Sequence, residues 1–432
     1  MNDEKSNLEN AINQNSASSL SETPSLPNAA TLSRKPINKK WIVLAILPIV
    51  LIVFLINFSL NTNSDKHDLF NCGLVPAKTN DKWGYIDKTG KYVISPQFDD
   101  ANSFASNGIA LVENNEKYGY IDNTGTYIAE PQFDFARSFT DNGLAVVKSG
   151  KRYGYINKQG TYAINPQFDY ANSFDDNGLA IIEVNEKYGY IDKTGKYVIS
   201  PQFEQAYNFS DNGLAAVVSQ FLWGYIDKTG KYIINPQFKF ALEFKNNLAL
   251  VYNGELWGCI NKTGKYVINP QFDRAYDFSD NGLSLVQIGD LWGYIDKTGN
   301  YAINPQFEGS GRFADNGLAL ANSGNLYGYI DKTGKYVIDP QFDGASSFTK
   351  SGLAAVKSKN YWGYIDKTGA YVIAPQLDAA HSKDMANNDY VNPIPFYDDG
   401  YVVAHIGDKF GIIDHTGKCV VNLEFDGIEK WE

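Results

Sequence analysis

The sequence predicts an all-β tandem repeat array of about ten units of three short antiparallel strands, preceded by one transmembrane helix. An aromatic-Gly pair recurs ten times, spaced by 35 residues except for one step of 34 and a last step of 48. Each unit holds short apolar or alternating runs typical of strands. An uncharged apolar run of 18 residues precedes the first unit. A strict period in the range of about 20 to 50 residues indicates units that complete one another's core.

The anchor of each unit is a large ring followed by glycine. The ring varies among Trp, Tyr and Phe, all of which keep a large packing surface. We expect the ring to pack in the core over its glycine, and a row of exposed rings is the alternative. The structural anchors are Trp83, Gly84, Tyr118, Gly119, Tyr153, Gly154, Tyr188, Gly189, Trp223, Gly224, Trp257, Gly258, Trp292, Gly293, Tyr327, Gly328, Trp362, Gly363, Phe410 and Gly411.

The unit over residues 178–209 shows the expected strands most clearly. Residues 178–183 form a β-branched run that is apolar on both faces, and residues 187–192 and 196–200 alternate between faces. The Asp-Lys-Thr-Gly loop between the last two runs predicts a tight hairpin, in which Asp caps turn amides and Gly supplies a positive φ. The Pro-Gln-Phe that follows cannot continue a hydrogen-bonded ladder, so we expect the third strand to end there. The remaining leg of the unit is expected to be irregular or to hold one helical turn.

The phase of the repeats favours an open, superhelical or solenoid-like array, with a closed propeller-like ring as the alternative. The first unit begins with its first strand and the last unit ends with its third, so no unit is visibly split between the chain ends. Ten units also exceed the usual four to eight blades of a propeller.

The N-terminal region divides by composition. Residues 1–40 are polar and lack apolar periodicity, which predicts a disordered cytoplasmic tail. Residues 41–60 are apolar enough for a transmembrane helix, and residues 61–72 form a linker to the repeats at 73–432. Basic residues crowd the N-terminal flank of the apolar segment, which places the tail in the cytoplasm and the repeats in the periplasm or outside the cell. A cleaved signal peptide fits less well, because about 40 residues precede the segment.

Charge and cysteine usage limit the partners. The net charge of −11 and the interleaved Lys and Asp residues argue against nucleic acid, which requires a basic stripe. Three cysteines are too few for a disulfide framework. Cys259 replaces a Tyr of other units and is expected to be a small buried residue. Cys72 and Cys419 belong to the first and last units, and their pairing is left open.

The last unit departs from the repeat. Thirteen extra residues precede it, which are expected to form a surface loop or a loop added to a binding face. His405 and His415 in this unit would need further ligands to hold a metal, so no metal site is predicted. The repeated aspartates, such as Asp87, are expected to cap hairpins rather than to bind calcium. No catalytic motif is present, and no catalytic residue or cofactor is predicted.

The motif Trp-Gly-Tyr-Ile-Asp-Lys-Thr-Gly-Lys-Tyr over residues 83–92 and 223–232 resembles the WG-repeat family, also called KWG repeats. The resemblance covers about 350 of the 432 residues. It implies a bacterial β-rich repeat protein that mediates interactions, and it supplies no catalytic residues. Together with the apolar segment, it predicts a non-enzymatic, membrane-tethered scaffold that binds a protein or a cell-envelope polymer. The alternatives are a polysaccharide-binding protein that uses rows of Tyr and Trp, and a structural spacer.

Overall fold

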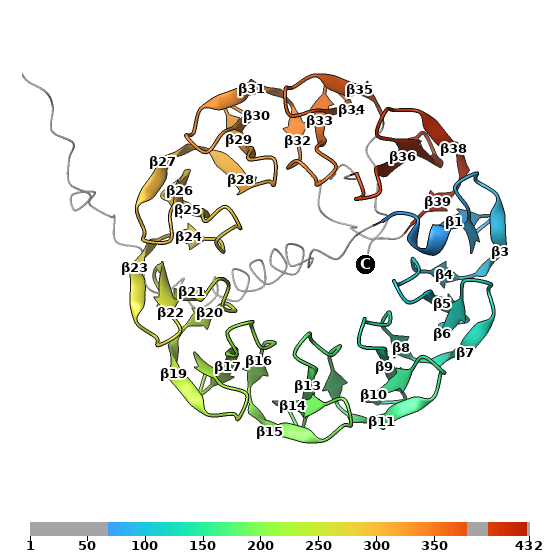
Figure 1. Cartoon of the computed structure of the whole chain (residues 1–432), viewed down its shortest axis with the longest axis horizontal. Coiled ribbons are helices and arrows are strands. Elements are labelled where there is room, and N and C mark those ends of the chain that lie inside the picture. Colours follow the sequence, from blue (N-terminus) through green and yellow to red (C-terminus); the bar gives the residue numbers. More distant parts are fainter. Residues whose placement is uncertain (1–67, 378–395, 430–432) are drawn as a thin grey trace, which may run out of the picture. The chain divides into compact units, whose positions relative to one another are not determined.

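The computed structural model describes residues 68–377 and 396–429, which form strands and turns and one short 3-10 turn, η2 (Asn71–Gly73) (Figure 1). No helix in these two ranges is long and apolar enough to cross a bilayer. The predicted tail at 1–40 and transmembrane helix at 41–60 lie outside the described residues. Residues 66–432 form one compact unit.

The described strands form ten separate antiparallel sheets, arranged in sequence order around a ring as the blades of a propeller (Figure 1). Nine sheets have four strands, which we call innermost, second, third and outer from the centre of the ring outward. The innermost strands are β4 (Asp100–Ala101), β8 (Phe135–Ala136), β12 (Tyr170–Ala171), β16 (Gln205–Ala206), β20 (Phe240–Ala241), β24 (Arg274–Ala275), β28 (Gly309–Phe313), β32 (Gly344–Ala345) and β39 (Gly427–Ile428).

The other three strands of each blade correspond to the three strands expected from the sequence. The second strands are β1 (Val75–Thr79), β5 (Ile109–Asn114), β9 (Leu144–Ser149), β13 (Leu179–Val184), β17 (Ala215–Ser219), β21 (Leu248–Tyr252), β25 (Ser284–Ile288), β29 (Ala319–Ser323), β33 (Ala354–Ser358) and β36 (Tyr401–Ile406). The third strands are β2 (Lys82–Ile86), β6 (Lys117–Asp122), β10 (Arg152–Asn157), β14 (Lys187–Asp192), β18 (Leu222–Ile226), β22 (Trp257–Asn261), β26 (Leu291–Ile295), β30 (Leu326–Ile330), β34 (Tyr361–Ile365) and β37 (Lys409–Asp414). The outer strands are β3 (Tyr92–Phe98), β7 (Tyr127–Phe133), β11 (Tyr162–Phe168), β15 (Tyr197–Phe203), β19 (Tyr232–Phe238), β23 (Tyr266–Phe272), β27 (Tyr301–Phe307), β31 (Tyr336–Phe342), β35 (Tyr371–Leu377) and β38 (Cys419–Phe425).

Blades are numbered along the chain. Blade 1 is β1–β3 completed by β39, blade 2 is β4–β7, and the count continues to blade 9, β32–β35, and blade 10, β36–β38. Because successive strands are antiparallel, the loops alternate between two ends of the ring. One end, the hairpin face, carries the Asp-Lys-Thr-Gly loops and the loops that follow the innermost strands. The other end, the turn face, carries the tight turns between second and third strands.

The closed ring shows that the expected open solenoid was wrong. The C-terminal strand β39 pairs with β1, with Ala77 opposite Ile428 and Lys78 opposite Gly427. Blade 1 is therefore split between the two ends of the described chain, as closed propellers commonly are. The closing strand has only two residues, too few to show a period, so the split could not be recognised from the sequence. A shared core of Val75, Ile86, Val421 and Phe425 also packs blade 10 against blade 1.

The leg expected to be irregular or helical instead holds the innermost strand of the next blade. In blade 2, Asp100 and Ala101 pair with Glu113 and Val112 of β5. This strand was not predicted because a two-residue strand is too short to show the alternation of apolar and polar residues. Each unit therefore spans a blade boundary, with its three longer strands in one blade and its last residues in the next.

The expectation that the third predicted strand ends at Pro was also wrong. The outer strand β3 continues through Pro96 to Phe98. Trp83 pairs with Phe98 and Tyr85 with Ile94, so the outer strand has two extra residues opposite Gly84. Pro is tolerated there because the outer strand is a sheet edge, where an amide donor is not needed.

The cores lie between blades, as expected from units that share their packing surfaces. Tyr85, Ile94 and Phe98 of blade 1 form one buried cluster with Phe104 and Val112 of blade 2. The same arrangement recurs around the ring.

Candidate functional site

Each anchor glycine lies where the bulged outer strand crosses the third strand. A Cβ atom on Gly84 would lie 2.4 Å from the carbonyl oxygen of Ile94 and 2.7 Å from the nitrogen of Pro96. These atoms belong to the backbone and cannot rotate away. The same close approach, under 3 Å, is found at Gly119, Gly154, Gly189, Gly224, Gly258, Gly293, Gly328, Gly363 and Gly411. Glycine is therefore required for close backbone contact.

The anchor rings are buried or half-buried. Those with less than about a tenth of their surface exposed are Trp83, Trp223, Trp257 and Trp362. The half-buried rings are Tyr118, Tyr153, Tyr188, Trp292, Tyr327 and Phe410. Neighbouring rings stack against them, as Tyr207 does on Trp223 with centroids 4.9 Å apart. These positions do not form an exposed aromatic row.

The second aromatic of the motif joins adjacent blades. The Tyr85 side chain is fully buried, and its hydroxyl donates to the carbonyl oxygen of Asn102 in blade 2 at 2.8 Å. Burial raises the pKa of this hydroxyl far above its ordinary value. The equivalent donors are Tyr120, Tyr155, Tyr190, Tyr225, Tyr294 and Tyr329.

In blade 6, Cys259 replaces this Tyr. A related substitution is found in blade 7. Cys259 is buried where other blades have the Tyr, which raises its pKa to about 12. The acceptor that the missing hydroxyl would have used is the carbonyl oxygen of Tyr276. The hydroxyl of Ser284 donates to this oxygen instead, from a fully buried position that is Ala in most other blades. The two changes compensate each other across a blade boundary.

The repeated aspartates are used by their own hairpins. One carboxylate oxygen of Asp87 accepts the backbone N–H of Thr89 at 2.8 Å, the Thr89 hydroxyl at 2.6 Å and the backbone N–H of Lys91 at 3.2 Å. These bonds, the Thr89 hydroxyl first, lower the pKa of Asp87. The same cap, as expected from the sequence, recurs at Asp122, Asp192, Asp227, Asp296, Asp331, Asp366 and Asp414.

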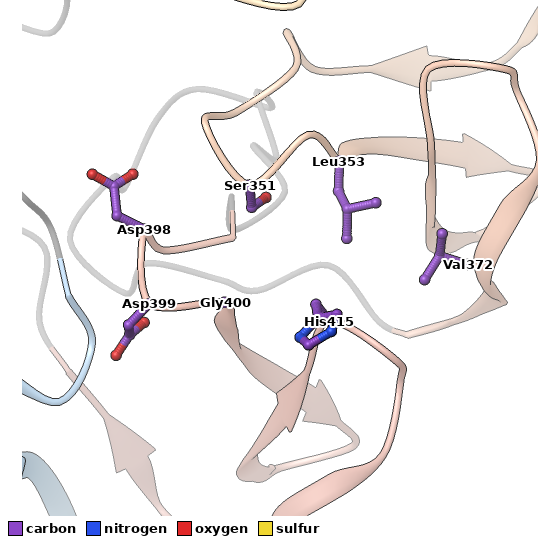
Figure 2. Close-up of a pocket in the computed structure, with 7 residues that line it drawn as sticks. All are labelled: Ser351, Leu353, Val372, Asp398, Asp399, Gly400 and His415. Carbon is purple, nitrogen blue, oxygen red and sulfur yellow. The ribbon is translucent and has the colours of Figure 1, made fainter.

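A pocket of about 450 Å³ opens on the hairpin face between blades 9 and 10, where the repetition is broken. It is lined by Ser351, Leu353, Val372, Asp398, Asp399, Gly400 and His415. Figure 2 shows Leu353 and Val372 directed toward the imidazole of His415, while the carboxylates of Asp398 and Asp399 point away from it. The site combines an apolar wall with polar edges, a composition that is typical of ligand pockets.

The acidic edge of this pocket is partly paired. Asp398 lies 3.8 Å from the Lys350 ammonium, and Asp399 accepts the backbone N–H of Phe70 at 3.2 Å. The other carboxylate oxygen of Asp399 is buried without a partner among the described residues. Phe70 also meets the ring of Tyr401 edge to face, so the start of the described chain is held on the hairpin face.

The structure does not bring the two candidate histidines together, and it leaves Cys72 and Cys419 unpaired. His405 lies on β36 against the ring of Phe410, whereas His415 lies in the hairpin at the opposite end of blade 10. Cys72 and Cys419 are exposed free thiols. Within 68–377 and 396–429, no group of three His, Cys, Asp or Glu side chains is placed to hold a metal ion. The insertion at 378–395 lies outside the described residues.

Two glutamates near the innermost strands have unusual environments that sequence reasoning missed. Burial, strengthened by the nearby Asp277 carboxylate, raises the pKa of Glu243 to about 7. Burial also raises the pKa of Glu429 to about 7, although the Tyr397 and Ser103 hydroxyls donate to its carboxylate. Glu429 therefore joins blade 1 to blades 2 and 10.

These glutamates make stability depend on pH. Their pKa is higher in the folded than in the unfolded state, so the folded protein binds more protons between about pH 4.5 and 7. The unfolding free energy should fall by roughly 1–3 kcal/mol as the pH rises from 5 to about 7.5. Thermal midpoints across this range measure the effect, and Glu243→Gln should reduce the slope by about half. A midpoint that rises with pH in this window would contradict the assignment. The hairpin aspartates titrate below it, because their pKa is lowered.

Comparison with solved structures supports the propeller fold. The crystal structure of the eukaryotic initiation factor aligns with a TM-score of 0.50 at 10% identity, covering 75% of this chain and 97% of that chain. Kluyveromyces lactis Hsv2 aligns with a TM-score of 0.30 at 12% identity, covering 53% of this chain and 86% of that chain. Only the first likeness, with its TM-score of 0.50, bears on the fold, and at such low identities neither bears on function. No curated protein matches the sequence.

The WG containing repeat family matches nine consecutive segments of the sequence. They cover residues 83–118, 118–153, 153–188, 188–219, 223–257, 257–292, 292–327, 327–362 and 362–386. Each segment begins at an anchor ring, and seven of the nine end at the next one, so the motif of the family coincides with the ring and the bulge-facing glycine described above. Because the match extends over more than half of the chain, this protein belongs to the WG containing repeat family.

Proposed function

We propose that this ten-bladed propeller is a non-catalytic binding module, tethered to a membrane through residues 41–60, that engages a protein or a cell-envelope polymer through its end faces. The observation that supports this most strongly is the internal use of the repeated polar and aromatic groups. The hairpin aspartates cap their own turns and the motif tyrosines bond to the next blade. The repeat thus builds the ring, and its variable loops remain for recognition.

The tether has a direct test that uses the exposed thiols. We expect the full chain to stay with membranes after an alkaline wash and the variant lacking 41–60 to be released. A membrane-impermeant maleimide should label Cys72 and Cys419 in intact bacterial cells, whereas the buried Cys259 should react only after unfolding. Release of the full chain, or labelling of Cys419 only after lysis, would contradict the proposed tether or its orientation.

Polysaccharide binding is a second candidate, supported by one exposed set of rings. The first residue of most outer strands is Tyr, and four of these are 40–45% exposed: Tyr162, Tyr197, Tyr301 and Tyr371. They lie in blades 3, 4, 7 and 9 and offer rings on which sugars could stack. Glycan-array binding that is lost in Tyr162→Ala with Tyr197→Ala would support this candidate. An array without binding would remove it and leave protein recognition.

A further inference from the structure

The two halves of the ring differ at the residue just before each anchor ring, at the turn face. In blades 1 to 4 and 10 this residue is a cation, and in blades 5 to 9 it is apolar. The cations are Lys82, Lys117, Arg152, Lys187 and Lys409. The apolar residues, which with Phe221 we call the apolar arc, are Leu222, Leu256, Leu291, Leu326 and Tyr361. They follow one another in five consecutive blades.

In the cationic half, four of the five cations form an ion pair with a carboxylate. The Lys82 ammonium pairs with Asp99, the residue that leads from blade 1 into blade 2. Asp99 also accepts the backbone N–H of Asn115 in the next turn at 2.7 Å. The same ion pair joins Lys117 to Asp134, Arg152 to Asp169 and Lys409 to Asp426.

In three blades of the apolar half, the carboxylate remains but its cation is missing, whereas Lys239 stands at the equivalent position beside Leu222. Trp292 pairs with Phe307 as Trp83 pairs with Phe98, so Leu291 and Glu308 occupy the places of Lys82 and Asp99. Asp273, Glu308 and Asp343 still cap the next turn, as the 2.8 Å bond from the Gly289 N–H to Asp273 shows. None of the three forms an ion pair with any residue that the structure describes. Each of these carboxylates therefore has an apolar side chain beside it, at the position where the other half of the ring has Lys or Arg.

Four of the six residues of the apolar arc are exposed, the other two are half-buried, and one of the exposed residues is strained. Leu291 is 40% exposed, Tyr361 49% and Phe221 85%. Phe221 is at a turn position with a φ of 61°, and most equivalent turns use Asn, Gly or a charged residue. The left-handed conformation costs about 1–2 kcal/mol for a residue other than glycine. A strained, solvent-exposed aromatic ring at a hairpin tip points to a binding role.

We propose that the apolar arc, with Asp273, Glu308 and Asp343, binds a protein segment that combines apolar side chains with Lys or Arg. The segment's apolar side chains would cover the leucines, and its cations would occupy the positions that Lys82 and its equivalents fill in the other half. An apolar centre with a charge-complementary rim is the usual composition of a protein interface. This inference rests on the proposed function and specifies the surface and the partner chemistry.

The test uses the full chain in nanodiscs of zwitterionic lipid and two labelled peptides of equal charge. One peptide alternates Leu and Lys, and the other alternates Ser and Lys. We expect the Leu–Lys peptide to bind at least about tenfold more tightly, because it contacts both the leucines and the acids. The variant L291K/L326K/Y361K should lose this preference. It introduces the residue type that other blades already carry at this position, so it is expected to fold. The control variant K82Q/K117Q on the other half should bind as the unmodified chain does.

Phe221→Asn separates binding from folding. Asn accepts the left-handed conformation better than Phe, so we expect a higher thermal midpoint together with an affinity for the Leu–Lys peptide reduced about tenfold. Equal binding of the two peptides, or unchanged binding by the triple variant, would overturn the proposal. Self-association of the full chain that the triple variant abolishes would identify a second copy as the occupant and also overturn it. None of these results would alter membrane retention or Cys419 labelling, which test the proposed function separately.

Discussion

Replacing Gly224 with Ala is expected to destabilise the folded protein by roughly 3–5 kcal/mol. The added Cβ would lie 2.6 Å from the carbonyl oxygen of Ile234 and 2.7 Å from the nitrogen of Pro236. Both are backbone atoms of the outer strand, so relief requires the bulge to move and the pairing of Trp223 with Phe238 to loosen. Denaturant unfolding of the purified chain, monitored by Trp fluorescence, measures the change.

Gly213→Ala is the matched control. Gly213 has a φ of 82°, but no atom lies within 4 Å of the position of an added Cβ. Its replacement therefore adds backbone strain alone, about 1–2 kcal/mol. If the two variants were equally destabilised, the close approach of the outer strand would not be the reason for the anchor glycine.

Ending the chain after Phe425 is expected to open the ring, with a loss of roughly 3–6 kcal/mol. The truncation removes β39, its pairing with β1, the buried side chain of Ile428 and the hydroxyl contacts of Glu429. It leaves the second strand β1 as an edge. We expect amides of β1 and of blade 10 to lose hydrogen-exchange protection, while those of blades 4 to 7 keep it.

Ending the chain after Glu429 provides the control, because β39 is kept. This variant should retain the thermal midpoint and the exchange pattern of the full chain. Equal effects of the two truncations would mean that residues beyond Glu429, and not β39, close the ring. The closed ring also changes the expectation for a spacer, since removing two whole units would disturb closure instead of shortening a rod.

The sequence predicted the repeat, the three longer strands and the capped hairpins because each has a local signature. The alternation in residues 187–192 and the Asp-Lys-Thr-Gly loop depend only on neighbouring residues. Ring closure depends on the small rotation between blades, which no single unit encodes. The two-residue strands, such as Asp100–Ala101, lie below the length at which a period can be recognised. The bulge opposite Gly84 likewise depends on a register between strands.

The candidate binding surfaces could be predicted less well than the repeat. The insertion before the last unit pointed to blade 10 as a candidate site. The pocket lined by Leu353 and His415 lies between blades 9 and 10. The apolar arc was missed, although its signal is present in the sequence as a change from Lys82 to Leu291 at one repeat position. This difference is not apparent when the ten units are treated as equivalent. The raised pKa of Glu243 depends on burial by neighbouring blades and has no local signature.

Ser284 makes the hydrogen bond that Cys259 cannot make, so the two units that contain them depend on each other and are no longer interchangeable with other units. Unequal recombination can delete or duplicate a 35-residue module in a gene of this kind. A crossover that separated the two codons would leave a buried carbonyl oxygen at the junction with no hydroxyl donor, or supply it with two. Such a product would begin with a penalty of about 1–3 kcal/mol at one seam. A deletion or duplication with an end point between these two codons is therefore expected to be less stable than one elsewhere in the array.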